Sequence, residues 1–141
     1  MKILYSLLLS ILVISLSSCN EYPKDKLGVV DFANKIKEYP NAQIIDVRTP
    51  EEFSKGHLIN AVNIDYHSND FNKQLDAFDK QQPVFVYCLS GSRSSSAGKK
   101  MHKSGFEKVY QLDGGIIKWR AADMPETTGY LEKKTILEQL K

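Results

Sequence analysis

Cys88 stands where the sequence pattern predicts a reactive thiol. It follows the apolar run 83–87, and a helical pattern begins soon after it. The loop between them consists of Leu89, Ser90, Gly91, Ser92 and Arg93. A loop that closes onto a helix N-terminus directs backbone N–H groups inward and forms an anion site. The helix dipole and the charge of Arg93 would both favour the thiolate, which is the nucleophilic form. The pattern therefore predicts a nucleophilic Cys88 in a cradle of loop residues, with a buried structural cysteine as the alternative.

Short β-branched runs alternate with amphipathic segments from residue 28 to about residue 125, and these elements would position the thiol. We expect strands over residues 28–30, 43–47, 61–64, 83–87 and 109–112. We expect helices from Asp31 to before Pro40, from Pro50 to before Gly56, and over 71–78, 94–103 and 116–122. This alternation predicts an α/β fold with a mainly parallel central sheet and helices on both faces. The apolar run 83–87 fits the centre of that sheet, and ligands bind beyond the carboxyl ends of such strands.

Composition fits one globular domain and gives no sign of several other classes of protein. The 141 residues are 42% apolar and 26% charged, with a formal net charge of +2. So small a charge gives no electrostatic reason to expect a nucleic-acid partner. The two cysteines, Cys19 and Cys88, make no disulfide framework, and no histidine stands at zinc-ligand spacing from a cysteine. We therefore expect neither a metal nor a cofactor.

The N-terminus has the pattern of a secretory leader. Lys2 precedes an apolar run over residues 3–16, which is shorter than the roughly 20 residues that span a bilayer. The run ends in Leu16-Ser17-Ser18-Cys19, which resembles the lipobox of bacterial lipoproteins and implies cleavage before Cys19 and lipidation of its thiol. We expect a lipoprotein signal peptide at 1–18 and a lipidated tether at 19–27. The protein would then be anchored to a membrane of the bacterial cell envelope, facing the periplasm or the exterior. An ordinary signal anchor with an incidental Cys19 is the alternative.

Three segments, in the right order, resemble the signatures of the single-domain rhodanese (sulfurtransferase) family. They are Ile44 to Phe53 continuing through Gly56 to Ala61, the loop from Cys88 to Arg93 with Ser94, and Leu112 to Trp119. The resemblance implies one rhodanese-like domain over residues 28–126. The tail at 127–141 carries apolar residues at intervals that favour a helix packed on the domain.

The resemblance also implies a reaction. Cys88 would carry sulfur as a persulfide, and Arg93 would close a loop whose N–H groups, from Leu89 to Arg93, bind the substrate. Sulfane sulfur would move from a thiosulfate-like donor to a thiol or cyanide acceptor. The alternative is a membrane-tethered, non-catalytic module that binds a partner protein or delivers sulfur to it.

Two features of the loop bear on its chemistry. Four residues separate Cys88 from Arg93, whereas phosphatases that share this fold have one more. The count therefore argues against phosphatase or arsenate-reductase activity. Leu89 stands where some members of the family have a basic or polar residue, which weakens the case for thiosulfate as the physiological donor.

The remaining signature residues have structural explanations. Asp46 and Arg48 are candidate supporting residues, and we expect Asp46 to accept hydrogen bonds from neighbouring backbone. We expect Arg48 to pair with Glu52 across a helical turn. His57 is expected to be packed and hydrogen-bonded rather than a general base. We expect a turn at Gly114 and Gly115 and a core position for Trp119.

Overall fold

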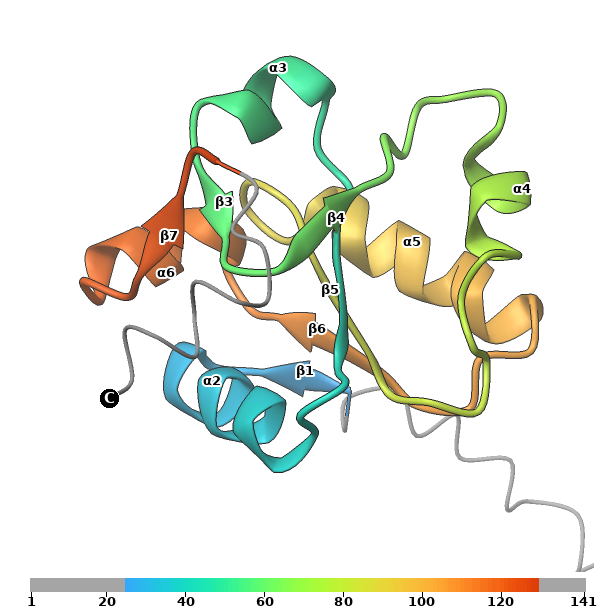
Figure 1. Ribbon diagram of the computed structural model, residues 1–141, viewed down its shortest axis with the longest axis horizontal. Helices are drawn as coiled ribbons and strands as arrows, with labels where there is room; N and C mark the ends of the chain where they lie inside the picture. The colour runs from blue at the N-terminus through green and yellow to red at the C-terminus, as the bar shows by residue number, and fades with distance from the viewer. Residues whose placement is uncertain (1–24, 130–141) are drawn as a thin grey trace, which may run out of the picture.

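The computed structural model describes residues 25–129, and a parallel sheet runs through its centre (Figure 1). In space the strands follow the order β1, β6, β5, β2, β4, and each neighbouring pair is parallel. They are β1 (Lys26–Leu27), β2 (Gln43–Asp46), β4 (Ala61–Asn63), β5 (Val84–Tyr87) and β6 (Val109–Leu112). The order puts β5, which leads into Cys88, in the middle of the sheet. The predicted α/β class with a mainly parallel sheet is confirmed.

Helices cover both faces of the sheet. They are α2 (Val29–Glu38), α3 (Pro50–Ser54), α4 (Phe71–Leu75), α5 (Ser92–Lys103) and α6 (Gly115–Ala121). Successive side chains of β5 point to opposite faces. Val84 and Val86 belong to the core cluster that α4 and α5 cover, whereas Phe85 and Tyr87 belong to the cluster that α2 and α6 cover. The apolar character of the whole run follows from this burial on both sides.

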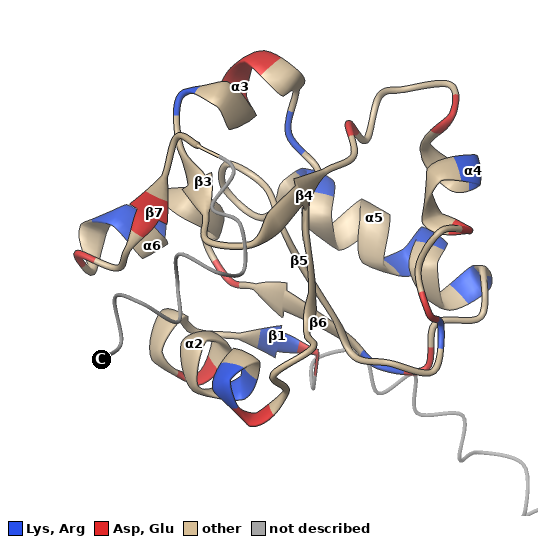
Figure 2. Ribbon diagram, in the orientation of Figure 1, with Lys and Arg blue, Asp and Glu red and all other residues tan. Residues whose placement is uncertain are grey.

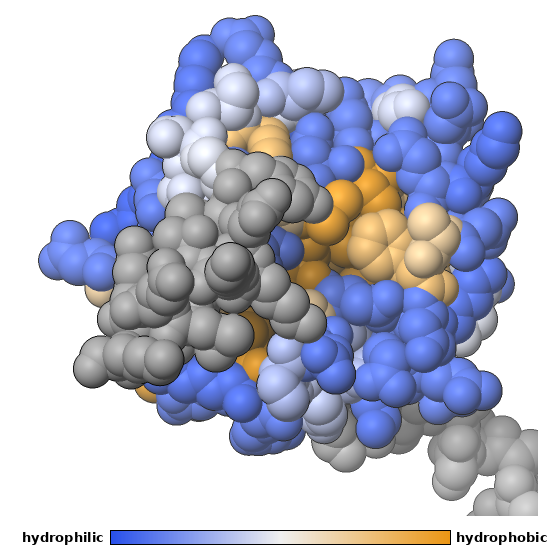
Figure 3. All heavy atoms as spheres, in the orientation of Figure 1, coloured by the Kyte–Doolittle hydropathy of each residue, from blue (hydrophilic) through white to orange (hydrophobic). Residues whose placement is uncertain are grey.

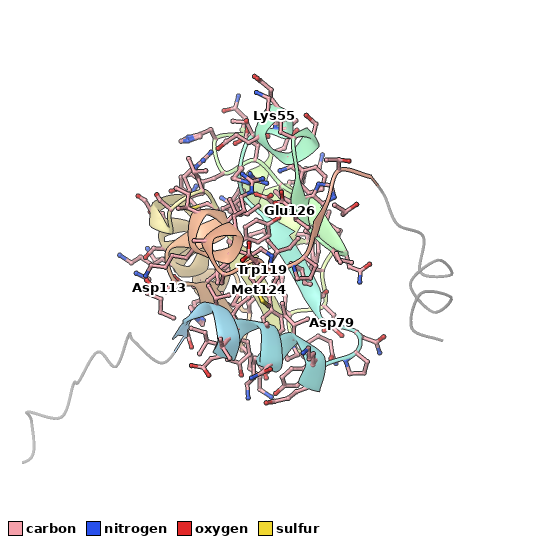
Figure 4. All side chains as sticks on the ribbon, turned by 90° about the vertical axis from the view of Figure 1, so that its left-hand side faces the viewer. Lys55, Asp79, Asp113, Trp119, Met124 and Glu126 are labelled. Carbon is pink, nitrogen blue, oxygen red and sulfur yellow. The ribbon has the colours of Figure 1, made fainter. Side chains whose placement is uncertain are left out.

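Trp119 lies in the core, as expected. It is 5% exposed, and it lies beside Met124 on the side of the sheet that α2 covers (Figure 4). Its ring meets that of Phe32 edge to face, with the centroids 6.3 Å apart. The indole N–H donates to the carbonyl oxygen of Pro125 at 3.0 Å. The one polar group of this buried ring is therefore satisfied.

The prediction of a strand at 28–30 is wrong. Val29 and Val30 form the first turn of α2, and the N–H of Phe32 donates to the carbonyl oxygen of Gly28 at 2.8 Å. The two valines favour a strand by their β-branching. Helix α2 nevertheless buries Phe32 and Ala33, and Val29 packs against the same core cluster, whereas Val30 is 67% exposed. The packing of this amphipathic helix on the sheet outweighs the local preference of the two valines.

The sheet begins inside the predicted tether. Lys26 and Leu27 form β1 and pair with Gln111 and Leu112 of β6. The tether can therefore extend no further than residue 25. The predicted signal peptide, Cys19 and residues 130–141 of the tail lie outside the described residues.

A short antiparallel ribbon joins two distant parts of the chain. Strand β3 (His57–Leu58) pairs with β7 (Glu126–Thr127), so the tail predicted from residue 127 begins within a strand. Two-residue strands are too short to show an alternating pattern, and neither was predicted. Helix α4 also ends earlier than the predicted helix at 71–78, with Phe78 packed against the core beyond its end.

Strand β4 forms one edge of the sheet, and β1 forms the other. Apolar side chains reach the surface near β4 in Figure 3, where most of the described surface is hydrophilic, and Val62 is 38% exposed. Within residues 25–129, no helix is both long enough and apolar enough to span a bilayer.

Candidate active site

Cys88 lies directly beyond the carboxyl end of the central strand, and its thiol is held by the loop that follows. The side chain is 1% exposed. The backbone N–H of Gly91 donates to Sγ at 3.1 Å. The Ser94 hydroxyl lies 3.5 Å from Sγ and 3.1 Å from the carbonyl oxygen of Gly91. Of the five predicted loop residues, Ser90 and Gly91 have N–H groups that hydrogen-bond the sulfur, and Ser94 adds a side-chain donor that was not predicted.

The surroundings favour the thiolate of Cys88. Burial raises the pKa of the thiol, but hydrogen bonds from the Ser94 hydroxyl and from the N–H groups of Ser94, Gly91 and Ser90 lower it more. The net result is a pKa below the ordinary value for a cysteine. These donors are neutral groups at the start of α5. Hydrogen bonds to Sγ are therefore the largest of the influences that favour the thiolate.

The glycine turn before α6 supports the active loop from behind. The N–H of Ile116 donates to the carbonyl oxygen of Cys88 at 2.9 Å, and that of Ile117 donates to Leu89 at 3.2 Å. Gly115 has φ of +58°, and a Cβ built on it would lie 2.5 Å from both of those carbonyl oxygens. Only glycine lets the two segments approach so closely. Gly114 lies in the predicted turn, whereas Gly115 is the first residue of α6, and its contact with the loop fixes the backbone that carries the thiol.

Arg93 forms a bidentate ion pair with Glu52 of α3. Its Nη1 lies 2.8 Å from Oε2 and its Nη2 lies 2.8 Å from Oε1. Figure 2 shows acidic residues on α3 and a basic residue at the start of α5. The hydrogen bonds from Arg93 lower the pKa of Glu52 to about 2, with further help from Thr49, although burial opposes the shift. The expected pairing of Arg48 with Glu52 is therefore wrong.

Arg48 pairs with Asp46 in the interior. Asp46 is 0% exposed and Arg48 is 2% exposed, and Nη2 lies 2.6 Å from Oδ2. The N–H of Arg48 also donates to Asp46 Oδ1 at 2.9 Å, which confirms the expected backbone hydrogen bond. Because Arg48 precedes α3, its side chain turns back to the strand and does not follow the helix to Glu52.

The buried pair extends into a network behind the site. Arg48 donates to the carbonyl oxygen of Gly56 at 2.7 Å. The Tyr87 hydroxyl accepts the N–H of Leu58 at 3.0 Å, and burial together with the neighbouring Asp46 carboxylate raises the pKa of that tyrosine. The network ties the ends of β2 and β5 to β3. Asp46 and Arg48 therefore support the strand that leads into Cys88 and have no hydrogen bond to its sulfur.

His57 is packed, as predicted. It is 4% exposed, its Nδ1 lies 2.9 Å from the carbonyl oxygen of Phe53, and its ring stacks on that of Phe53 at 3.6 Å. Among residues 25–129 no group of three or more potential metal ligands is present.

The chain is similar to known proteins over most of its described residues. The family model described as "Rhodanese-like domain" matches residues 29–122. The chain is 41% identical over 81 residues to the uncharacterized protein YqhL of Bacillus subtilis, covering 57% of this chain and 63% of that protein, which is less than two thirds of its length. It is 39% identical over 88 residues to the thiosulfate sulfurtransferase GlpE of Pseudomonas aeruginosa, covering 62% and 77%.

A solved structure also resembles this fold. The polysulfide-sulfur transferase homodimer of Wolinella succinogenes has a TM-score of 0.62 with it at 28% identity, covering 72% of this chain and 77% of that one. The similarity thus extends over most of the described residues.

Proposed function

Because the chain belongs to the rhodanese-like domain family, we propose that it is a sulfurtransferase that carries sulfane sulfur as a persulfide on Cys88. One observation supports this most directly. The Cys88 sulfur is surrounded by N–H donors and a hydroxyl at the start of a helix, which is an arrangement that stabilises a sulfur anion.

The proposed reaction has two displacement steps. In the first, the Cys88 thiolate attacks the outer sulfur of a donor. With thiosulfate, the bond between the two donor sulfurs breaks and its electron pair leaves with sulfite, which gives the Cys88 persulfide. In the second, cyanide or a thiolate attacks the terminal sulfur, and the electron pair of the breaking S–S bond returns to Cys88. The products are thiocyanate or a new persulfide, and the thiolate is regenerated.

The test is a measurement of intact protein mass after incubation with thiosulfate, methanethiosulfonate or a low-molecular-weight persulfide. We expect a gain of one sulfur atom that cyanide removes and that Cys88→Ser abolishes. No gain with any donor would contradict the proposal, as would a gain that persists in Cys88→Ser. Capture of a partner protein without sulfur gain and without dependence on Cys88 would favour the non-catalytic module.

We further propose that the domain is held at a membrane of the bacterial cell envelope by a lipid on Cys19, on the evidence of the lipobox-like Leu16-Ser17-Ser18-Cys19. A sulfur-acceptor protein at that membrane would be a natural partner. The full chain should partition into detergent and incorporate labelled fatty acid, and Cys19→Ser should do neither. Labelling that is unchanged in Cys19→Ser would count against the anchor.

A further inference from the structure

We propose that Glu52 selects among sulfur donors by charge: it neutralises Arg93, so that the site disfavours dianionic donors such as thiosulfate relative to donors of lower negative charge. This inference rests on the proposed sulfur transfer at Cys88. It assigns a specificity-determining role to a residue of α3, which lies far from the active loop in the sequence.

The first step of the argument is the geometry of the ion pair. Arg93 is the cationic residue of the loop that follows Cys88, and both terminal nitrogens of its guanidinium are taken by the two Glu52 oxygens at 2.8 Å. The side chains are 21% and 28% exposed, so water screens the pair less than it screens a surface pair. A bidentate pair, with two parallel N–H···O hydrogen bonds, is among the strongest hydrogen-bonding arrangements of arginine with a carboxylate.

The second step is that Glu52 is itself held in place. Its Oε2 accepts the N–H of Thr49 at 3.0 Å, and its own N–H donates to the Thr49 hydroxyl at 3.2 Å, which is a capping box at the start of α3. The carboxylate cannot easily turn away from Arg93 without breaking this cap. The pairing is therefore a fixed feature of the site.

The third step is the charge that a sulfur donor meets when it approaches Cys88. The hydrogen-bond donors to the Cys88 sulfur are uncharged groups. The other residues of the loop are also uncharged, and they are Leu89, Ser90, Gly91 and Ser92. With Arg93 neutralised, an approaching anion meets a thiolate and no free cation from the loop. Electrostatic repulsion grows with the charge of the donor, so a dianion is penalised more than a monoanion.

Glu52→Gln is the variant that isolates this effect. Glutamine keeps the shape and also serves in a capping box, and its carbonyl oxygen can still accept one hydrogen bond from Arg93. The negative charge is lost together with one of the two acceptor oxygens. Glu51→Gln is the matched control, because Glu51 is the adjacent carboxylate on α3 but pairs with Lys55 at the surface.

We expect Glu52→Gln to lower the KM for thiosulfate about two- to fivefold, which is the factor that corresponds to the free energy of a partly exposed ion pair. The KM for methanethiosulfonate, a monoanion that also donates sulfane sulfur, should fall by a smaller factor. Glu51→Gln should leave the ratio of the two KM values unchanged. Equal changes for both donors, or the same change in Glu51→Gln, would overturn the proposal.

Alkylation of Cys88 gives a readout that does not require sulfur transfer. The ratio of the rate with iodoacetate, an anion, to the rate with neutral iodoacetamide should rise in Glu52→Gln and stay constant in Glu51→Gln. In the unmutated protein this ratio should not exceed that of a cysteine peptide, and a clearly higher ratio would overturn the proposal without any variant.

The two proposals can fail separately. If no sulfur donor adds sulfur to Cys88 but the ratio of alkylation rates still rises in Glu52→Gln, the sulfurtransferase function fails and charge selection at the site is upheld. An unchanged ratio in Glu52→Gln overturns charge selection.

Discussion

The Cys88 thiol depends on neutral hydrogen-bond donors, and Ser94 supplies the one that comes from a side chain. Ser94 is 0% exposed and occupies the first turn of α5, where its hydroxyl reaches both Sγ and the carbonyl oxygen of Gly91. Among the groups that lower the pKa of Cys88, this hydroxyl has the largest effect. A backbone donor can be removed only by proline, which also fixes φ, so Ser94→Ala is the more direct test of how the thiolate is stabilised.

We predict that Ser94→Ala raises the pKa of Cys88, because the donor with the largest lowering effect is removed while the burial of the thiol remains. At neutral pH the rate of alkylation by iodoacetamide should fall about two- to tenfold. This factor corresponds to the free energy of one lost hydrogen bond to the thiolate. The measurement is the pH dependence of that rate. Ser95→Ala, at the next position of α5, should leave the profile unchanged. An identical profile for Ser94→Ala and the unmutated protein would refute the assignment.

The buried pair of Asp46 and Arg48 makes a second prediction at the residue scale. Asp46→Asn leaves the Arg48 guanidinium, which is 2% exposed, without a counter-charge. Loss of one partner of a buried pair lowers the free energy of unfolding by about 3–5 kcal/mol. Urea denaturation measures this, with Glu51→Gln at the exposed Lys55 pair as a control that should change little. A loss for Asp46→Asn no larger than the control would show that the interior accommodates the unpaired charge.

At the scale of elements, the active loop is clamped between α5 and α6. The start of α5 holds the sulfur, while N–H groups of Ile116 and Ile117 hold the carbonyl oxygens of Cys88 and Leu89. The position of the thiol therefore depends on the close approach of Gly115 to the loop. This contact explains why the residue at position 115, shortly after β6, is a glycine.

We predict that Gly115→Ala disrupts this clamp. A methyl group there would lie 2.5 Å from two backbone oxygens, and φ of +58° is unfavourable for alanine. The free energy of unfolding should fall by about 1–3 kcal/mol, and sulfur loading of Cys88 should fall with it. Gly129→Ala, where a Cβ would meet nothing within 4 Å, is the control. Denaturant unfolding and intact mass measure the two effects, and equal stability of both variants would contradict the clamp.

Most elements could be predicted from the sequence because their patterns are local. The strand ending at Asp46, the apolar run of β5 and the proline-initiated α3 each contain their own signal. The partner of Arg93 could not be predicted, because Glu52 lies 41 residues away and only the folded chain brings them together. The pairing expected for Arg48 was wrong because the helical spacing rule applies only within a helix, and Arg48 precedes Pro50.

At the scale of the whole molecule, an ion pair between residues distant in the sequence links α3 to α5 beside the sheet. The Glu52 and Arg93 pair is this link, and it joins the signature segment around α3 to the active loop. Its strength depends on ionisation of Glu52. The stability of the molecule should therefore depend on pH in a range set by this carboxyl group.

We predict that the pair stabilises the fold at neutral pH and that this contribution disappears in acid. The pKa of Glu52 falls from 4.5 to about 2 on folding, chiefly because of the hydrogen bonds from Arg93. For a carboxyl group whose pKa is lowered on folding, the stabilisation is present above pH 4.5 and is lost as the pH falls toward 2. The free energy of unfolding of the unmutated protein should therefore exceed that of Glu52→Gln at pH 7, and the difference should shrink between pH 5 and pH 2. Urea denaturation of both proteins across this range measures it. A difference that stays constant with pH would mean that Glu52 stabilises the fold through its shape and cap rather than through its charge.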